Sequence, residues 1–443
     1  MVVMDLFSGA GGLSEGFHRE NFRIVAHVEK DYWACETLKT RTIFHFLKKN
    51  GDLDLYHHYV MEAKEGARPD EYRKKIYEKY PELKQWVEHV VLNKKFGDPN
   101  KDPDATSTSE IIRLMEKSLK LADETKVDII IGGPPCQAYS LVGRGRMKSF
   151  AEHDPRNFLF YYYKEIVDHF RPKIFVFENV PGILSAKKGS VYLKIKEEFS
   201  SIGYTLLSGP RKNDFDNVVD FSEYGIPQTR KRVLLFGFQS GLNFTYPDFN
   251  KHRINWTIPL TTMAVLSDLP SLVPGEGNDA FLGTYGEFDS VPLNEYQSLM
   301  RENSIGIMNH KARPINERDR EIYKMAIEKA SKGIKLLYNH LPERLKTHRN
   351  ENSFLDRFKV HQANGLPHTV VAHIAKDGHY NIHPDPAQVR SLTVREAARI
   401  QTFPDNYKFE GSRTAQYIQV GNAVPPLMSS IIAKTIKEML SDV

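Results

Sequence analysis

The sequence predicts a doubly wound α/β sheet, and the order of its first elements is the main reason. Residues 2–7 form a largely apolar strand that runs directly into the glycine-rich turn Ser8-Gly9-Ala10-Gly11-Gly12. A helix over 13–20 and a second strand over 22–28 follow, which is the order that opens such sheets. Further strand-like apolar runs occur at 127–131, 174–177 and 233–236, and they are separated by helical stretches such as 158–170 and 190–201. These residues alone predict a parallel sheet with helices on both faces.

The composition is that of an ordinary globular protein. The 443 residues include 61 Lys and Arg against 56 Asp and Glu, a net charge of +5, which permits a nucleic-acid partner without requiring one. No apolar run approaches the roughly 18 residues that a membrane span needs. The start, MVVMDLF, is too short and too acidic for a signal peptide. Two cysteines exclude a disulfide scaffold or a cysteine-rich metal module and suit a reducing cytosol.

Two regions depart from the alternation of strands and helices. The segment from about 40 to 104 is rich in Lys, Glu, His and Tyr, and its apolar residues fall near helical spacing, so we expect a charged helical insertion rather than a disordered linker. From about 240 to 390, scattered Pro, Gly, Asn and aromatic residues predict a second domain of irregular and β character. The last stretch, 427–440, is an amphipathic helix introduced by Pro425-Pro426.

The glycine-rich turn is a candidate cofactor site. Glycines let the backbone turn sharply and let a ligand approach closely, although a merely structural corner has the same pattern. Glu29 lies 20 positions after Gly9 at the end of the second strand, where an acid can accept hydrogen bonds from both ribose hydroxyls. The full dinucleotide fingerprint requires a glycine where this chain has Ser14. The turn therefore favours a nucleoside without a pyrophosphate, such as S-adenosylmethionine, over the dinucleotide of a dehydrogenase.

Cys136 is the candidate nucleophile. It follows Gly132-Gly133-Pro134-Pro135 at the carboxyl end of a buried strand, where open α/β sheets place their ligands. Its glycine and proline neighbours indicate a surface loop, whereas Cys35 has the surroundings of a helix core. A cysteine nucleophile needs thiolate character from a nearby cation or helix N-terminus. Three basic residues follow closely, and their loop could also grip phosphates: Arg144, Arg146 and Lys148.

Further polar residues lie at the ends of two strands. Glu178 ends the strand at 174–177, where a carboxyl in a partly apolar pocket can act as a proton donor, although a solvated capping acid is the simpler interpretation. Arg230 and Arg232 alternate before the strand at 233–236 and so share a face. Such a pair could hold a carbonyl oxygen and a phosphate, or could simply mark an exposed edge.

Six sequence blocks resemble those of the cytosine-5 DNA methyltransferases and occur in that family's order. The cysteine block and the last two are specific, whereas the first and third are weak singly. The blocks are Asp5-Leu6-Phe7-Ser8-Gly9-Ala10-Gly11-Gly12, Gly133-Pro134-Pro135-Cys136-Gln137, Glu178-Asn179-Val180, Gln228-Thr229-Arg230-Lys231-Arg232, residues 390–401 with Phe403-Pro404, and Gln419-Val420-Gly421-Asn422-Ala423-Val424-Pro425-Pro426. The resemblance says little about residues 40–104 or 240–385.

The resemblance implies a doubly wound mixed sheet of the S-adenosylmethionine-dependent methyltransferase type, with a smaller irregular or β target-recognition domain. Residues 1–240 would form the catalytic and cofactor-binding domain, with the charged helical insertion at about 40–104. Residues 241–414 would form the target-recognition domain. Residues 415–443 would return to complete the catalytic domain and would place Gly421-Asn422-Ala423 beside the glycine-rich turn.

The family's chemistry implies a role for each matching residue. Cys136 would add to carbon 6 of a cytosine that has been swung out of the duplex, and Glu178 would contact ring nitrogen 3 and the exocyclic amine. Arg232, with Arg230, would donate near the base oxygen and the backbone. The implied cofactor is S-adenosylmethionine, with S-adenosylhomocysteine as product and no metal. The residues implied at the cofactor are Phe7, Ser8, Gly9, Ala10, Gly11, Gly12, Glu29, Pro134, Asn422 and Ala423, and those implied at DNA are Gln137, Arg144, Arg146 and Lys148.

One acid of the family's pattern has no obvious counterpart in this chain. The family usually has an acid after its third strand that contacts the adenine, shortly before the cysteine block. Here the charged insertion intervenes. Asp98 in Phe96-Gly97-Asp98 is the candidate, and Asp52 in Gly51-Asp52-Leu53 is its rival.

The resemblance implies duplex DNA as the partner, with a restriction endonuclease possible as a separately acting companion. It implies a monomer in the cytoplasm, at the nucleoid, with no membrane contact. A relative that methylates cytosine in transfer RNA shares the chemistry, but the long recognition stretch favours DNA. A catalytically inactive DNA-binding relative is the other alternative, and the intact Cys136, Glu178 and cofactor turn argue against it. Residues 361–373 offer polar side chains suited to base edges, or form an ordinary loop and strand.

Overall fold

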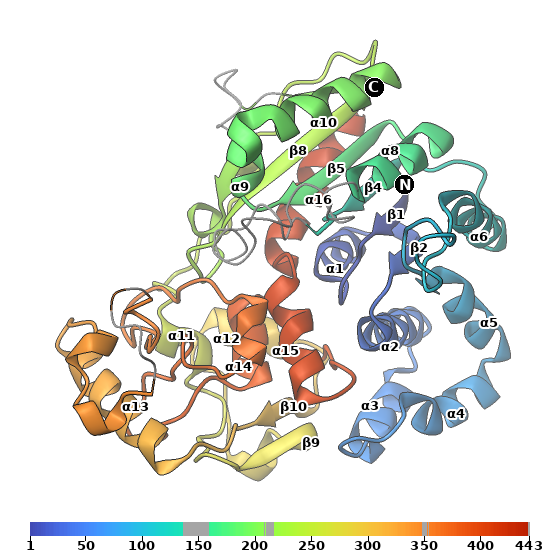
Figure 1. The fold of residues 1–443 in the computed structure, drawn as a ribbon. Coiled ribbons are helices and arrows are strands. Elements are labelled where there is room, and N and C mark those ends of the chain that lie inside the picture. Colours follow the sequence, from blue (N-terminus) through green and yellow to red (C-terminus); the bar gives the residue numbers. More distant parts are fainter. Residues whose placement is uncertain (136–158, 208, 210–216, 348–351, 353, 442–443) are drawn as a thin grey trace.

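A central mixed β-sheet organises the molecule (Figure 1). The computed structural model describes residues 1–135, 159–207, 209, 217–347, 352 and 354–441. The strand order is β3-β2-β1-β4-β5-β8-β6, and β7 also pairs with β8. The strands are β1 (Val2–Leu6), β2 (Arg23–Glu29), β3 (Val91–Asn93), β4 (Ile129–Gly132), β5 (Ile174–Asn179), β6 (Tyr204–Leu206), β7 (Val218–Asp220) and β8 (Lys231–Gln239).

The predicted doubly wound mixed sheet is confirmed, but the purely parallel sheet expected from the strand pattern is wrong at one strand. Strands β1 to β5 run parallel, whereas β8 is antiparallel to β5, β6 and β7. The short connection from β7 to β8 explains the reversal, because parallel neighbours need a crossover of a dozen or more residues. Hydrophobicity alone could not show the direction of β8, since β8 is buried like the parallel strands of the sheet.

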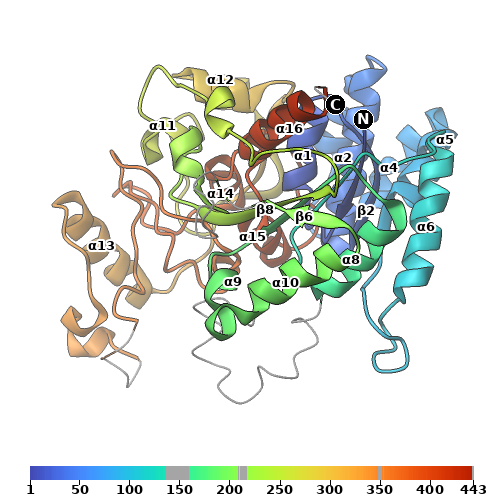
Figure 2. The same cartoon turned by 90° about the horizontal axis from the view of Figure 1, so that it is seen from above.

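Helices cover both faces of the sheet, so its strands are apolar on both sides (Figure 2). One face packs against α1 (Gly12–Arg19) and α16 (Pro426–Ser441). The other face packs against α6 (Thr108–Leu121), α8 (Leu159–Phe170) and α10 (Ser190–Ser201). Within β1, Val3 faces the first layer and Met4 the second, as the alternation of a strand requires. The carboxyl ends of the parallel strands therefore meet at one edge, next to the start of α1.

The C-terminal helix α16 lies against α1, the first helix of the chain, and forms part of the same core. Gly16 allows this close approach, because a Cβ there would lie 2.3 Å from the Ser430 nitrogen. Ser429 donates its hydroxyl to the Leu13 carbonyl at the same contact. The last residues of the chain are therefore structurally part of the N-terminal half.

A Gly16→Ala substitution is expected to lower the free energy of unfolding by about 1–3 kcal/mol, the usual cost of overpacking. The added methyl group would meet backbone atoms of α16, which cannot rotate away as a side chain can. Urea denaturation measures the effect. Gly286→Ala is the matched control, because a Cβ there meets nothing within 4 Å. Equal stability of Gly16→Ala and wild type would contradict the close contact of the two helices.

The charged region near the N-terminus folds as a block of helices: α2 (Tyr32–Lys49), α3 (Leu53–Glu62), α4 (Pro69–Lys79) and α5 (Pro81–Val90). The sequence predicts an insertion over residues 40–104, but the extra helices, α3 to α5, cover only the middle of that segment. Its first residues continue α2, and its end supplies the edge strand β3. The helices α3 to α5 are the part outside the α/β alternation.

The region after β8 contains short helices and one antiparallel hairpin, in keeping with the expected irregular and β character. The hairpin is β9 (Gly277–Thr284) with β10 (Gly306–Lys311). The helices are α11 (Thr262–Leu266), α12 (Glu295–Arg301), α13 (Glu317–Ser331), α14 (Val394–Ile400) and α15 (Arg413–Asn422).

A short helix of the N-terminal half, α9 (Gly182–Ser185), follows β5. No helix in the described ranges has the length and hydrophobicity required to cross a bilayer.

The α3–α5 block contacts the β9–β10 hairpin (Figure 1). Met308 of the hairpin belongs to the apolar cluster of this block. Glu65, between α3 and α4, accepts a hydrogen bond from the Asp279 backbone at 2.7 Å and pairs with Lys311 at 2.6 Å. The extra helices therefore join the N-terminal half to the second domain.

The segment between α14 and α15 also contacts the N-terminal half. Tyr407 donates its hydroxyl to the Ala10 carbonyl, and Arg41 donates to the Asn406 side chain at 2.7 Å. Thr40 donates to Glu410 at 2.8 Å. The chain thus returns to the cofactor turn and α2 before residue 414, where we place the end of the target-recognition domain.

Candidate active site

The glycine-rich turn lies between β1 and α1, and its backbone is left-handed at three positions. The φ angles are 55° at Phe7, 54° at Gly9 and 82° at Gly11. A Cβ on Gly9 would meet nothing within 4 Å, whereas a Cβ on Gly11 would lie 2.7 Å from Leu38. Gly11 is therefore required by packing, while Gly9 borders open space. Open space beside a left-handed glycine is what a close-lying ligand needs.

Glu29 holds this turn from the end of β2. One carboxylate oxygen accepts a hydrogen bond from the Gly9 nitrogen at 2.9 Å, and the other accepts from the backbone of Lys30 and Asp31, both at 2.8 Å. Burial raises the pKa of the Glu29 carboxyl, and these three hydrogen bonds partly offset the rise. The acid expected to bind ribose is thus fixed beside the turn.

The C-terminal segment lies against the same turn, as the sequence blocks implied. A Cβ on Gly12 would lie 2.3 Å from the Val424 carbonyl oxygen and 3.0 Å from the Ala423 Cβ. Ala423 is buried, and Asn422, at the end of α15, is exposed. Two segments about 410 positions apart in the sequence therefore line one region. The open space at Gly9, the fixed Glu29 carboxylate and the exposed Asn422 fit a nucleoside cofactor.

The structure places the two candidate adenine acids differently. The ring of Phe96 lies 5.0 Å from the ring of Phe7, so the segment that carries Asp98 adjoins the glycine-rich turn. Asp52 begins α3 and pairs with Lys79 at 2.6 Å within the extra helical block. This arrangement favours Asp98.

Glu178 and Arg232 form an ion pair where β5 and β8 lie side by side. Arg232 Nε lies 2.9 Å from Glu178 Oε1, and each side chain is 12% exposed. Burial lowers the pKa of Arg232, and the adjacent Glu178 partly offsets this effect. A Cβ on Gly133 would lie 2.9 Å from Glu178 Oε2, so that glycine leaves room for the acid. The pair combines a carboxylate and a planar donor at the carboxyl edge of the sheet.

Asn179, which the sequence analysis did not single out, holds the start of the cysteine loop. Its side-chain amide donates to the Pro134 carbonyl at 3.0 Å, and the residue is 5% exposed. The hydrogen bond ties the end of β5 to the segment that leaves β4. The only available signal was its position directly after Glu178 in the third sequence block.

The placement of Arg230 disagrees with the expectation that it donates near the base oxygen and the DNA backbone. Its side chain is 1% exposed, and its terminal nitrogens donate to the Val370 and Ala423 carbonyls, both at 2.8 Å. Alternation placed Arg230 and Arg232 on one face, but alternation does not show depth. Arg230 lies below the surface that Arg232 approaches.

The cysteine loop itself lies outside the residues that the structure describes. This applies to Cys136 and to four residues expected near DNA: Gln137, Arg144, Arg146 and Lys148. The described flanks of this segment are Pro134, after β4, and the start of α8.

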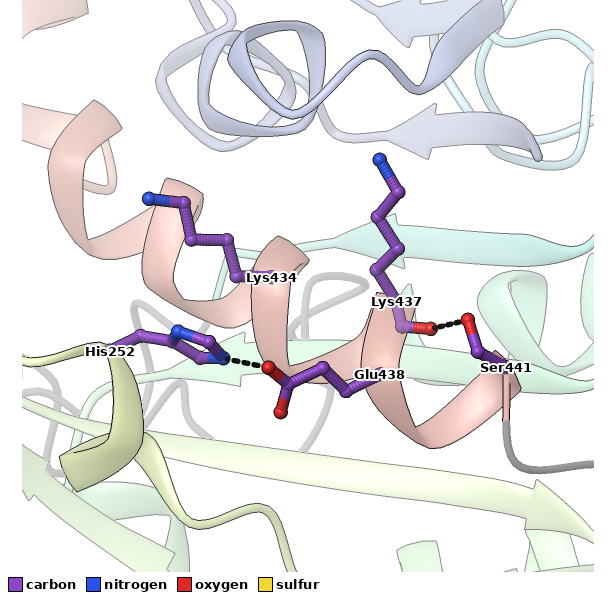
Figure 3. A pocket seen from close by; sticks show the side chains of 5 residues that line it. All are labelled: His252, Lys434, Lys437, Glu438 and Ser441. Atoms are coloured by element: carbon purple, nitrogen blue, oxygen red, sulfur yellow. Dashed lines mark hydrogen bonds and ion pairs between the residues drawn. The ribbon is translucent and has the colours of Figure 1, made fainter.

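A shallow pocket elsewhere does not belong to this site (Figure 3). It lies on the outer side of α16 and is lined by His252, Lys434, Lys437, Glu438 and Ser441. His252 pairs with Glu438 at 3.0 Å across it. None of its lining residues is among the candidate site residues.

Comparison with known proteins identifies the family. The family model for the C-5 cytosine-specific DNA methylases matches residues 1–58 and 93–438. The chain belongs to the C-5 cytosine-specific DNA methylase family. This family model leaves out residues 439–443 and residues 59–92, and the latter correspond to the end of α3, the helices α4 and α5 and the start of β3.

Two relatives of this methylase are type II methyltransferases. M.Bpa9945I from Bacillus paralicheniformis is 61% identical over 442 residues, which cover 100% of this chain and 99% of the relative. M.DdeI from Desulfomicrobium norvegicum is 31% identical, with 98% and 88% covered. The fold resembles a solved structure from an E. coli prophage, described as a DNA modification methyltransferase, with a TM-score of 0.60, 22% identity and coverage of 100% and 99%.

Proposed function

We propose that this DNA cytosine-5 methyltransferase acts on a flipped-out cytosine in one specific duplex sequence, through a covalent bond to Cys136. The methyl donor is S-adenosylmethionine, which supplies the methyl group when bound. The observation that carries the proposal is the Glu178–Arg232 pair at 2.9 Å, next to the segment that leads to Cys136. Ring carbons of cytosine cannot be reached inside the base stack, so the base has to leave the duplex.

Cys136 adds to carbon 6 of the cytosine ring in this proposal. Attack there places electron density on carbon 5, which then accepts the methyl group. Carbon 5 next loses its proton to water, the electron pair restores the 5,6 double bond, and the thiolate leaves carbon 6. Asn179 supports this step indirectly, because its bond to the Pro134 carbonyl fixes the backbone two residues before the sulfur.

Glu178 contacts ring nitrogen 3 and the exocyclic amine of the base, and Arg232 holds that acid in place. The ion pair at 2.9 Å leaves Glu178 Oε2 directed toward Gly133, on the side of the cysteine loop. A hydrogen bond to ring nitrogen 3 disperses the charge that thiolate addition places on the ring.

The cofactor is held by the turn around Gly9, with Glu29 at the ribose and Asp98 at the adenine. Ser8, Ala10 and the backbone of Gly12 shape the turn. Phe7, Pro134, Asn422 and Ala423 complete the surroundings. These assignments rest on the open space at Gly9, the fixed Glu29 carboxylate and the ring contact that brings the Asp98 segment to Phe7.

The remaining parts of the proposal concern DNA and the cellular setting. Gln137, Arg144, Arg146 and Lys148 bind DNA near the target base, and residues 241–414 read its sequence. The type II relatives support a restriction–modification role with a separately acting endonuclease. We further propose that the enzyme needs no metal and works as a monomer at the nucleoid in the cytoplasm.

Expression in a methylation-free bacterial host tests the proposed function. Bisulfite sequencing of the host DNA is expected to show 5-methylcytosine at one recurring sequence, and the Cys136→Ala variant is expected to leave that sequence unmethylated. Absence of 5-methylcytosine from DNA made with a folded wild-type protein would contradict the proposal. Bisulfite sequencing of transfer RNA from the same cells distinguishes the RNA-methylating alternative.

A further inference from the structure

Arg230 joins three segments of the chain that lie far apart in sequence. It directly precedes β8, the strand that carries Arg232. One terminal nitrogen donates to the Val370 carbonyl and the other to the Ala423 carbonyl, both at 2.8 Å. One guanidinium thus connects the catalytic strand, the second domain and the C-terminal segment.

The burial of this cation is energetically unfavourable unless the contacts compensate for it. Arg230 forms no ion pair with the residues that the structure describes, and its Nε has no hydrogen-bond partner among them. Burial lowers its pKa well below the usual range, and the like charge of Arg232 acts in the same direction. A buried charge without a counter-ion is rare in proteins. The described compensation consists of the two carbonyl contacts and the attraction of Glu178, which acts without a direct ion pair.

Of the two segments that Arg230 holds, one lies at the cofactor turn and the other lies in the domain that we propose reads DNA. Ala423 packs against Gly12 of the cofactor turn and directly follows Asn422. Val370 follows His368, whose backbone forms a parallel bridge with Thr229. The Val370 segment belongs to the domain that we propose reads DNA.

A neighbouring glutamine reinforces the contact with Val370. The Gln228 side-chain oxygen accepts a hydrogen bond from the Val370 nitrogen at 3.3 Å, and its amide donates to Gln401 at 2.7 Å. Gln228 and Arg230, which lie just before β8, therefore bind the backbone nitrogen and the carbonyl oxygen of Val370. The Val370 and Ala423 segments cannot move apart unless the Arg230 contacts break.

We propose that Arg230 is a positioning residue that couples cofactor binding to DNA binding, an inference that rests on the proposed function. A cofactor that orders the Ala423 segment orders Val370 through the same guanidinium, and DNA that orders Val370 acts in the reverse direction. Such coupling is reciprocal, so each ligand strengthens the binding of the other by the same factor.

The coupling factor is measured as the Kd of a duplex containing the mapped target sequence, without and with saturating S-adenosylhomocysteine. We expect a wild-type factor within the roughly 5- to 150-fold range of coupled sites. In Arg230→Met, which keeps length but loses every donor, the factor is expected to fall to about 2 or less. Arg230→Lys, which can reach only one carbonyl, is expected to lie between the two.

Arg73→Lys is the matched control. Arg73 is also a fully buried arginine, but it contacts Glu36 and Thr40 in the helical block, away from both ligands. It is expected to lose stability while keeping the wild-type coupling factor. A wild-type factor of one, or an unchanged factor in a folded Arg230→Met, would overturn the inference. A wild type that binds S-adenosylhomocysteine but methylates no DNA would instead overturn the proposed function.

Hydrogen exchange on the wild type keeps the inference testable if the Arg230 variants do not fold. S-adenosylhomocysteine alone is expected to slow amide exchange at 368–371, although these residues belong to the domain that we propose reads DNA. The helix α13, in the same domain but without contact to Arg230, is expected to exchange at an unchanged rate. Equal exchange at 368–371 with and without S-adenosylhomocysteine would refute the coupling.

Discussion

Replacement of Cys136 by alanine is expected to reduce methyl transfer to DNA by at least about three orders of magnitude, as loss of a covalent nucleophile does in other enzymes. Alanine cannot add to carbon 6, so carbon 5 keeps too little electron density to accept a methyl group. Transfer of a radiolabelled methyl group to a duplex with the mapped target sequence measures the effect. Binding of S-adenosylhomocysteine is expected to remain close to wild type, because the described cofactor turn does not involve Cys136.

Cys35→Ala is the matched control for this substitution. Cys35 is buried in α2, and its thiol donates to the Glu29 carbonyl at 3.3 Å. Burial raises the pKa of this thiol far above its usual range, so it carries no thiolate at neutral pH. Cys35→Ala is expected to keep methyl transfer. A duplex with 5-fluorocytosine at the target should trap wild type and Cys35→Ala covalently but not Cys136→Ala, and an adduct with Cys136→Ala would refute the assignment.

A Glu178→Gln substitution is expected to slow methyl transfer by roughly 100- to 10,000-fold, the usual range for loss of a proton-transfer group. Glutamine cannot share a proton with ring nitrogen 3, and it leaves Arg232 in its pocket without a counter-charge. Single-turnover kinetics at saturating DNA and cofactor separate the chemical step from binding. We expect the loss in the rate constant of that step, with smaller changes in the Kd of DNA.

Glu396→Gln controls for the general effect of neutralising a buried acid. Glu396 lies at the start of α14, with no described contact to Glu178 or Arg232, and pairs with Arg390 at 2.7 Å. Its pKa is strongly lowered by Arg390 despite burial. This variant is expected to unfold at lower urea concentration yet to keep the single-turnover rate. Similar rates for Glu178→Gln and Glu396→Gln would remove Glu178 from the proposed chemistry.

Much of the fold could be predicted because local pattern and tertiary position agree. The glycine-rich turn, the strands β1, β2, β4 and β5, and the helices α10 and α16 lie where strand and helix periodicity placed them. The direction of β8 could not be predicted from its residues, because a strand buried on both faces has the same composition in either direction. The direction of β8 depends on the short strand β7 and on the short connection between β7 and β8, and neither has a clear sequence pattern. The helix α13 was missed, since its charged surface hides its apolar positions.

Residues of the candidate site could be predicted where the spacing of a sequence motif corresponds to a contact in the folded chain. Glu29 could be found from its spacing to Gly9, and their hydrogen bond at 2.9 Å agrees with that reasoning. The depth of Arg230 could not be found, because residues 140 and 193 positions away in the sequence bury it. The choice of Asp98 over Asp52 stays a prediction, to which the folded chain adds that Phe96, two residues before Asp98, contacts Phe7.

The contact between the α3–α5 helices and the β9–β10 hairpin limits how the specificity of this enzyme can be redesigned. Met308 is buried against that helical block, and Glu65 pairs with Lys311 across the same contact. A chimera that receives only residues 241–414 from a donor lacking the helices would bring a hairpin shaped for a different neighbour. The apolar face that now covers Met308 would be left in water. Under the proposal that residues 241–414 read DNA, a graft of a new target specificity has to exchange the helical block and the hairpin as one unit.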